Sequence, residues 1–564
     1  MKPAYGFATL LVRGGRFLAS ASSIAYHPDM PDDVQRELDE AIAKVLASKS
    51  RKKLVVAGPG AGKTTLFRRL LDAAGGGPDD CIVLTFINNL KADLERTLGD
   101  AARVFTLHGY CQYLLRRYGE LRGGLTAKFR CYPGLVSLIK QDWEWLEGSP
   151  APKFVDLMRN LSCTEDQDDF YFERSDYYNA VDYDDSVYRV QCNIQGVAPP
   201  YELVLIDEFQ DFNRMEAAVI DALADVSPIV IAGDDDQALY SELRSASWDH
   251  IRAHYEGGHY EIFELPFCMR CPEVIVGAVG DIIQTAMRIK KLDGRIDKPY
   301  RYFEPVKGED SRRFPTIDLV ETSVQRGNAN YFGRFIEEVI SAIPEAELKL
   351  GVEKFEPAAL IIGSNPYRRQ VEEHLVERGL VALDPDAALD EREQASEILH
   401  EDPKSNLGWR IMLSLEGIDT ARPAVCAAGE KDAPLLDVIP EAMRSKILEE
   451  AKAWRKGSDP EGGGEPEKVP SVKITSFEGS KGLSAQYVFI VGLHSGDLPR
   501  VAEDIKDIEI CRLLVALTRT KKKCAVLVTR RFGDNFKQRS EFLGWVKPAR
   551  FEEKKIDAAY WRKK

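Results

Sequence analysis

The chain has 564 residues, 44% of them hydrophobic and 29% charged, and its formal net charge is −14 at pH 7. This length exceeds what one hydrophobic core holds, so we expect several globular domains. No run approaches the ~20 uninterrupted apolar residues of a membrane helix, and the acidic balance argues against a protein that coats nucleic acid non-specifically.

The N-terminal segment begins with a basic residue, but Arg13 and Arg16 interrupt the apolar run that a signal peptide requires. We therefore expect a cytoplasmic protein that does not associate with membranes. The ten cysteines agree with this compartment, because they are scattered singly apart from Cys268 and Cys271. One CxxC pair without a second is a weak signal for a metal or redox site.

The first strong motif is a phosphate-binding loop. Residues 54–67 read LVVAGPGAGKTTLF, an apolar strand followed by alternating glycines and the start of a helix. Glycine lets backbone N–H groups turn toward an anion, Lys63 reaches the outer phosphates, and Thr64 ligates Mg²⁺ at the helix N-terminus. The predicted nucleotide contacts in this loop are Gly58, Gly60, Ala61, Gly62, Lys63, Thr64 and Thr65. Such a loop serves many kinds of NTPase and does not define a function.

Two later strands end in acidic residues. ELVLIDEFQD and SPIVIAGDDDQ read as buried parallel strands, and ligands of such sheets bind at the carboxyl ends of strands. We predict that Asp207 holds Mg²⁺ through water and that Glu208 orients and deprotonates the attacking water. Gln237 lies where an amide can sense the γ-phosphate. A solvent-exposed acidic strand end and an ordinary Asp-rich turn are the structural alternatives.

A second alternating region begins near Cys268, and its last strands read VKITSF, YVFIVGL and KCAVLVTR. Arg270 and Arg519 belong to this region, so they reach a nucleotide only from across a domain cleft. That placement makes both arginines candidates for arginine fingers, which are worth ~10³ to 10⁵ in rate in P-loop enzymes. For a single arginine taken alone, a surface or ion-pair role is the more common one.

The motifs together resemble one family. The ordered set AGPGAGKTT, TFINN, TLHGYCQYLLRRYG, LIDEFQD, AGDDDQALY, MRCPEVI, SKGL and VALTRTKKK is similar to the UvrD/Rep/PcrA-like DNA helicases of superfamily 1. That family has two RecA-like domains with ATP in the cleft between them, and closure of the cleft moves single-stranded DNA in the 3′-to-5′ direction. The resemblance therefore implies ATP and Mg²⁺ as cofactors and single-stranded DNA as a partner.

The resemblance also implies roles for further residues. Gln35 corresponds loosely to the adenine contact of the family, and Gly482 belongs to its nucleotide-binding set. The positions that match DNA contacts are Phe86, Asn88, Thr106, His108, Tyr240 and Asn365. Aromatic faces stack bases irrespective of sequence, and amides and histidine contact phosphates. Taken alone, Phe86 reads as a core residue, because it adjoins a buried strand.

The expected fold class is α/β, with two RecA-like P-loop domains that have parallel sheets, each carrying a small, mostly helical insertion. The expected units are an N-terminal extension (1–29), the first RecA-like domain (30–110 and 200–267), its inserted subdomain (111–199), the second RecA-like domain (268–416 and 471–548), a reduced accessory insertion with linker (417–470), and a basic C-terminal tail (549–564).

The sequence departs from the family pattern at three places. After Tyr240 the chain reads SELRSAS, with no tryptophan before Trp248, so one stacking platform is in doubt. Glu478 stands where relatives commonly have a DNA-contacting histidine, and Ser484 where they commonly have a ribose-contacting glutamate. An acid near a phosphate repels it, so we expect a different local path of the DNA. The accessory insertion is small, which favours weak or partner-dependent strand separation.

Two functions are therefore weighed. The first is a motor, an ATP-dependent translocase or helicase on single-stranded DNA. The second is a regulatory ATPase subunit that controls a partner such as a nuclease in defence or repair, since compact UvrD-like proteins resemble the helicase subunit of the Gabija anti-phage system. An inactive nucleic-acid-binding module conflicts with the retained Lys63, Glu208 and Arg519.

Overall fold

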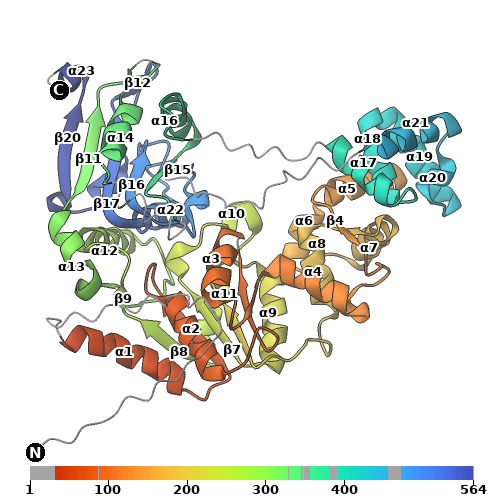
Figure 1. Ribbon diagram of the computed structural model, residues 1–564, viewed down its shortest axis with the longest axis horizontal. Coiled ribbons are helices and arrows are strands. Elements are labelled where there is room, and N and C mark those ends of the chain that lie inside the picture. Colours follow the sequence, from red (N-terminus) through yellow and green to blue (C-terminus); the bar gives the residue numbers. More distant parts are fainter. Residues whose placement is uncertain are drawn as a thin grey trace, which may run out of the picture.

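The computed structural model describes residues 32–86, 88–327, 329–344, 347, 356–381, 391–454 and 472–562. Two sheet domains lie next to each other, and a group of helices lies to one side of them (Figure 1). The predicted N-terminal extension and most of the predicted linker lie outside the described residues. Within the described ranges, no helix is both long and apolar enough to cross a membrane.

The first domain contains a six-stranded parallel sheet in the order β3-β2-β6-β7-β1-β8. Its strands are β1 (Lys52–Ala57), β2 (Cys81–Thr85), β3 (Arg103–Thr106), β6 (Leu203–Ile206), β7 (Ile229–Gly233) and β8 (Glu261–Leu265). Helices α1 (Asp32–Ala47), α2 (Lys63–Ala74) and α3 (Asn88–Leu98) cover one face, and α4 (Leu107–Arg117), α9 (Arg214–Val226) and α11 (Asp249–Glu256) cover the other.

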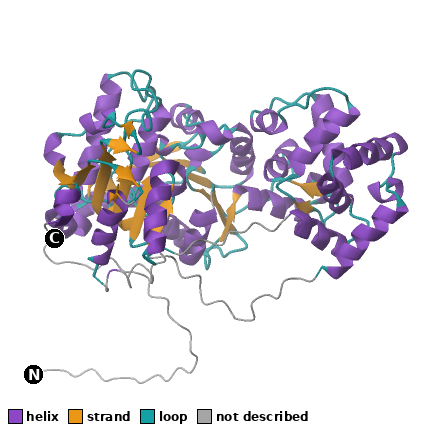
Figure 2. Cartoon of the chain, turned by 90° about the horizontal axis from the view of Figure 1, so that it is seen from above, coloured by secondary structure: helices purple, strands orange, loops and turns teal. Residues whose placement is uncertain are grey.

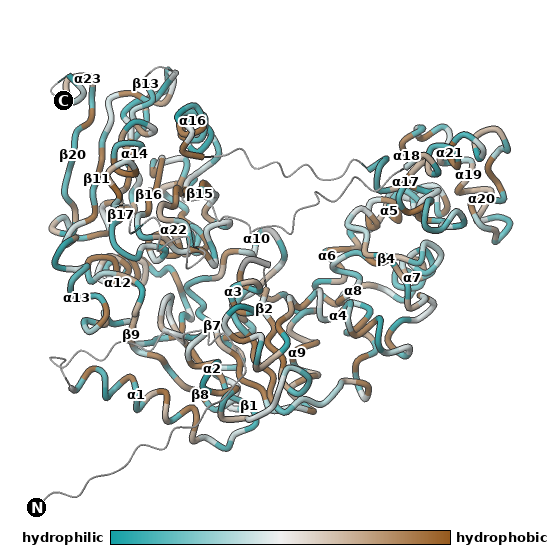
Figure 3. Tube along the Cα trace, viewed as in Figure 1, coloured by the Kyte–Doolittle hydropathy of each residue, from teal (hydrophilic) through white to brown (hydrophobic). Residues whose placement is uncertain are grey.

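Burial on both faces explains the apolar runs in these strands. Along β1, Leu54 and Val56 belong to the core under α4 and α9, whereas Val55 and Ala57 belong to the core under α1 and α2. Because successive side chains of a strand point to opposite faces, a sheet covered on both sides needs apolar residues at every position. Figure 3 shows this as brown stretches along the central strands.

The second domain repeats this arrangement, with the strand order β15-β14-β16-β17-β11-β20, again parallel. Its strands are β11 (Ile317–Thr322), β14 (Ala359–Gly363), β15 (Val472–Thr475), β16 (Ala485–Val491), β17 (Thr520–Thr529) and β20 (Phe551–Ile556). Helices α12 (Glu273–Arg288) and α22 (Asp507–Leu517) cover one face, and α14 (Tyr331–Ser341) and α16 (Asn365–Glu377) cover the other. The predicted α/β class with two parallel-sheet domains is confirmed.

Short elements complete the sheet domains and their connections. The remaining strands are β4 (Arg130–Cys131), β5 (Ala180–Val181), β9 (Phe267–Cys268), β10 (Arg301–Tyr302), β12 (Gln325–Arg326), β13 (Ala329–Asn330), β18 (Arg531–Phe532) and β19 (Asn535–Phe536), and the short helices of these domains include α10 (Ser241–Arg244), α13 (Glu304–Arg313) and α23 (Ala558–Arg562). Residues 551–556, expected in a basic tail, form the edge strand β20, which pairs with β11.

The helical part combines two insertions that are far apart in the sequence. The first contributes α5 (Leu135–Leu146), α6 (Phe154–Arg159), α7 (Glu165–Tyr178) and α8 (Tyr183–Asn193), and the second contributes α17 (Glu391–Glu401), α18 (Asn406–Glu416), α19 (Ile418–Lys431), α20 (Leu435–Val438) and α21 (Glu441–Ala453). Figure 1 shows the second group beside α5 and apart from the sheet whose chain it interrupts, and Figure 2 shows a mostly helical part set apart from most of the strands.

A buried carboxylate joins the two insertions. Asp142 of α5 accepts hydrogen bonds from Arg174 at 2.7 Å and from Arg410 of α18 at 3.0 Å. The helices α17 and α18 were expected in the second sheet domain, with the accessory insertion beginning only at residue 417. Instead, α17 and α18 belong to the helical part, because Ile398, Leu407 and their neighbours pack into its core.

Candidate nucleotide site and nucleic-acid groove

The phosphate-binding loop connects β1 to α2, as the sequence predicts. Gly60 and Gly62 have φ angles of 73° and 87°, in the left-handed region that favours glycine. A Cβ atom at Gly60 would lie 2.4 Å from Arg270 Cβ, and one at Gly62 would lie 2.3 Å from Met269 Cε. The loop therefore needs glycine for its backbone and for the close approach of the segment that leads into α12.

A cavity of about 550 Å³ lies against this loop, within the range of small-molecule sites. Residues of both sheet domains line it. From the predicted sets, the lining includes Gly60, Ala61, Gly62, Lys63, Thr64, Asp207, Glu208, Gln237, Arg270, Gly482 and Arg519. Residues that approach the phosphate loop from two separate domains therefore meet at one site.

The acids at the end of β6 face the loop lysine. Lys63 Nζ lies 2.8 Å from Glu208 Oε1 and 3.9 Å from Asp207 Oδ1. Glu208 has a φ of 55°, an uncommon conformation for a residue other than glycine, and such residues cluster at functional sites. Burial would raise the pKa of Glu208, but the ammonium groups of Lys63 and Lys481 outweigh it, and the pKa is lowered. Burial raises the pKa of Asp207 to about 6, against the opposing effect of Lys63.

Arg519 reaches the first domain from the end of α22. Its Nη2 donates to Gln237 Oε1 at 3.2 Å, and its Nε donates to the carbonyl oxygen of Val515 at 2.9 Å. Burial, together with neighbouring Arg270, lowers the pKa of Arg519 to about 10. Arg270 is held in turn by the Thr518 carbonyl oxygen at 3.4 Å. Both candidate arginine fingers are thus anchored to the second domain at the cavity.

Lys481 is a site residue that the sequence analysis missed. It comes from the second domain, yet its Nζ lies 2.5 Å from Asp211 Oδ2 and 3.7 Å from Glu208 Oε2. It also donates to the carbonyl oxygen of Gln237 at 2.5 Å. The signal was present in the motif SKGL, where a lysine precedes Gly482.

Three predicted nucleotide residues do not line this cavity. Gln35 lies on α1, where its Nε2 donates to Asp39 Oδ2 at 3.2 Å. Gly58 lines a small neighbouring cavity together with Tyr300. Thr65 points to solvent from the first turn of α2. Their predicted contacts with a nucleotide remain predictions.

A second cavity, of about 530 Å³, lies on the first domain and is called the Phe86 groove here. The predicted residues Phe86, Thr106 and His108 line it. Tyr183 of the inserted helices lines it too and is 51% exposed, so the groove offers an aromatic side chain that the sequence analysis missed. A groove with an exposed aromatic ring suits sequence-tolerant binding of single strands.

The aromatic residues of the predicted DNA path pack on one another. The ring centroids of Phe86 and Tyr240 lie 5.0 Å apart, and Phe86 is only 4% exposed. His108 is buried, which lowers its pKa to about 3, and its Nε2 lies 2.8 Å from Arg244 Nη2. Asn365 is an exposed residue at the start of α16. The side chain of Asn88 lies outside the described residues.

Comparison with known proteins agrees with this geometry. The protein family described as an AAA domain matches residues 39–242. DNA helicase II of Salmonella typhimurium (strain LT2) is 27% identical over 272 residues, which cover 41% of this chain and 36% of that protein. DNA helicase II of Escherichia coli (strain K12) is 27% identical over 356 residues, which cover 54% and 48% of the two chains.

The chain resembles the UvrD-like proteins of superfamily 1. Its aligned part spans between about a third and a half of the length of these two relatives.

At each departure from the family pattern, the side chain has a local partner. Arg244, in the segment that lacks the tryptophan, lies over the Phe86 ring with its Cζ 4.7 Å from the centroid. Glu478 does not carry an isolated charge, because Arg512 Nε donates to its Oε1 at 2.7 Å. Ser484 donates to Glu356 Oε1 at 3.4 Å, so a carboxylate from another segment lines the cavity beside it.

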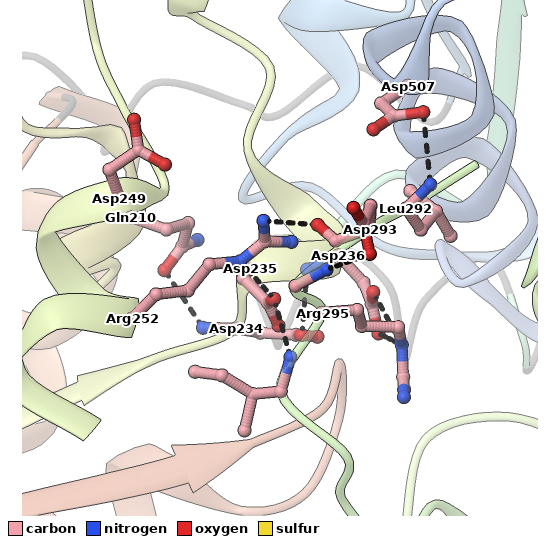
Figure 4. A network of polar contacts seen from close by, with 12 residues as sticks. Gln210, Asp234, Asp235, Asp236, Asp249, Arg252, Leu292, Asp293, Arg295 and Asp507 are labelled. Atoms are coloured by element: carbon pink, nitrogen blue, oxygen red, sulfur yellow. Dashed lines mark hydrogen bonds and ion pairs between the residues drawn. The ribbon is translucent and has the colours of Figure 1, made fainter. Parts of the chain in front are cut away.

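The Asp-rich turn after β7 is a closed ion network. Asp234, Asp235 and Asp236 lie close enough to hold a metal ion. The Lys298 ammonium contacts all three, at 2.8, 2.7 and 2.8 Å. Figure 4 shows further links, from Arg252 to Asp235 and from Arg295 to Asp236. The Lys298 ammonium group therefore takes the position that a divalent cation would need.

Proposed function

We propose that this protein is an ATP-dependent single-stranded DNA translocase or helicase that moves in the 3′-to-5′ direction. The observation that carries the proposal is the cavity in which Lys63, Glu208 and Arg519 meet, the last of them from the other sheet domain. Hydrolysis at such a site depends on how the two domains sit relative to each other. A nucleotide there is therefore coupled to domain movement.

The residues present fit MgATP. The glycine loop directs N–H groups toward an anion, and Lys63, Arg270 and Arg519 supply positive charge along the same cavity. Thr64 and Asp207 are the proposed ligands of Mg²⁺. Bound MgATP would supply the phosphoryl group whose transfer to water drives movement.

Glu208 is the proposed general base. In the described conformation Lys63 lies 2.8 Å from it and contributes to its lowered pKa. When Lys63 turns toward phosphate, Glu208 loses one of its two neighbouring ammonium groups and becomes a stronger base. Gln210 Nε2, which donates to Glu208 Oε2 at 2.6 Å, keeps the carboxylate oriented. Glu208 is thus able to act as a base only when Lys63 contacts phosphate instead of the carboxylate.

The test is ATP hydrolysis by the purified protein with and without oligo(dT), at two salt concentrations, with Glu208→Gln as the blank. Strong, salt-sensitive stimulation is the expected result. Strand displacement from duplexes with a 3′ or a 5′ tail then tests polarity, and only the 3′-tailed duplex should be unwound. Stimulation by DNA without movement on either substrate would contradict the motor assignment.

The second candidate is a regulatory ATPase that controls a partner such as a nuclease in defence or repair. The packing of Phe86 against Tyr240 favours it, since the two tilted rings lie 5.0 Å apart, centroid to centroid, and leave no room for a base between them. Hydrolysis indifferent to DNA would support this candidate. The polarity, the partner and the biological role all belong to the proposal.

A further inference from the structure

A guanidinium group bridges the two sheet domains beside α10, the helix whose Arg244 lines the Phe86 groove. Arg512 lies on α22, and its Nε donates to Glu478 Oε1 at 2.7 Å. Its Nη2 donates to Glu242 Oε2 at 3.1 Å, across the domain boundary. Glu242 lies on α10, two residues after Tyr240. These three residues are called the Arg512 bridge.

The two carboxylates of the bridge differ in their exposure to solvent. One cation faces two carboxylates, so the group carries a net charge of −1. The side chain of Arg512 is 10% exposed and that of Glu478 is 23% exposed, whereas that of Glu242 is 48% exposed. Ion pairs that water reaches contribute little to stability. The contact with Glu242 is therefore the one that another anion can replace.

The surroundings of the bridge belong to the predicted DNA path. The hydroxyl group of Tyr240 donates to the carbonyl oxygen of Glu478 at 3.3 Å, and the Tyr240 ring packs on Phe86. Arg244, also on α10, lines the Phe86 groove. A strand that enters this groove and separates Phe86 from Tyr240 must disturb α10, which carries Glu242. Phosphates of that strand then pass close to Arg512.

We propose that Arg512 binds a phosphate of single-stranded nucleic acid in exchange for Glu242, while Glu478 holds the guanidinium group in place. The inference rests on the proposed function, because it specifies part of the path of the strand. Arginine has donors on two edges and pairs well with phosphate. The carboxylate at position 478 thus orients the cation that meets the phosphate, and the exchange removes a carboxylate from the path.

The test is fluorescence anisotropy of labelled oligo(dT) without nucleotide, over a range of salt concentrations. Arg512→Gln should bind about tenfold more weakly, and the slope of log affinity against log salt should fall by about 0.7, the value for one phosphate contact on a single strand. Glu242→Gln should bind more tightly than the wild type, because its exposed carboxylate no longer competes.

The matched control is Arg530→Gln, which removes an arginine that pairs with Glu321 at the far end of β17. It should leave both affinity and slope unchanged. Because Glu242 is half exposed, its variant should fold even where Arg512→Gln does not.

Three results would overturn the inference. An unchanged affinity and slope in folded Arg512→Gln would remove Arg512 from the strand's path. Tighter binding by both Arg512→Gln and Glu242→Gln would show that the bridge only holds the two domains together and that Arg512 does not bind the strand. Weaker or unchanged binding by Glu242→Gln would show that its carboxylate does not compete. In each case wild-type binding to oligo(dT) would leave the proposed function intact, whereas absence of wild-type binding would contradict both.

Discussion

At the scale of single residues, the nucleotide site depends on a few charges in close contact. Lys63 and Lys481 both lie beside Glu208, one from each sheet domain. The acids between the two ammonium groups are buried. A neutral side chain in place of either lysine would leave these carboxylates with less positive charge beside them. Changing one charge at this site therefore changes the protonation of its neighbours.

Lys63→Ala should abolish ATP turnover, because it removes the cation that contacts the outer phosphates. Phosphate release at saturating ATP measures this, and the loss should exceed ~100-fold. Lys52→Ala, which removes a surface lysine paired with Asp225, is the control. Turnover of Lys63→Ala within a factor of two of the wild type would refute the site.

Lys298→Met should destabilise the protein by about 3 to 5 kcal/mol, because it leaves three buried carboxylates without their shared cation. Denaturant unfolding of the first domain gives the free energy. Lys506→Met, at an exposed pair with Asp504, is the control and should leave the free energy of unfolding unchanged within error. A loss below 1 kcal/mol for Lys298→Met would mean that Arg252 and Arg295 suffice for the turn.

At the residue scale, the sequence could predict which side chains lie together where a motif fixes both neighbours and geometry. The phosphate loop, Asp207 and Glu208 follow from strands that end at one sheet edge, so their meeting could be expected. Lys298 could not be expected, because no local pattern connects a lysine in a connection to acids some sixty positions earlier. Phe86 shows the ambiguity of a residue beside a buried strand, since it is buried and also lines a groove.

At the scale of elements, the apolar runs predicted strands in both sheets, but not the edge strand β20, whose residues were expected in a tail. What they did not give was the partner of each amphipathic helix. The apolar faces of α17 and α18 carry no information about which core receives them, and they pack into the helical part beside α5. Tertiary contacts, rather than local propensity, decided where the second insertion begins.

Asp142→Asn should weaken the joint between the two insertions by about 3 to 5 kcal/mol, since two buried arginines lose their counter-charge. We expect an early unfolding transition that tryptophan fluorescence reports, because Trp143, Trp145 and Trp409 lie in this part. Glu147→Gln, at the exposed end of α5, is the control. A single transition that coincides with that of the wild type would show that the joint does not limit stability.

At the scale of the whole molecule, buried neutral histidines tie stability to pH. Burial lowers the pKa of His494 to about 4, from an ordinary value of 6.5, against the opposing effect of Asp497. Between pH 6.5 and 4, the imidazole of His494 therefore binds a proton in the unfolded chain but not in the folded chain. This contribution is fully present above pH 6.5 and is lost as the pH falls toward 4.

The unfolding free energy of the wild type should consequently fall more steeply than that of His494→Gln between pH 6.5 and 4, by at most about 1.4 kcal/mol per pH unit. Glutamine keeps an acceptor for the N–H of Thr529, which lies 2.8 Å from His494 Nε2. Chemical denaturation at several pH values measures the difference. Parallel curves for the two proteins would show that His494 does not titrate on unfolding.

The network around Lys298 has a mechanical consequence. It fastens the turn after β7 to the connection between α12 and β10, and Leu292 in that connection donates to Asp507 of α22. Lys481 and Arg519 add buried contacts between the two domains, to Asp211 and Gln237. The pair of Arg512 and Glu242 is more exposed than these contacts. We therefore expect the domain boundary to open first beside α10 when the two domains move relative to each other.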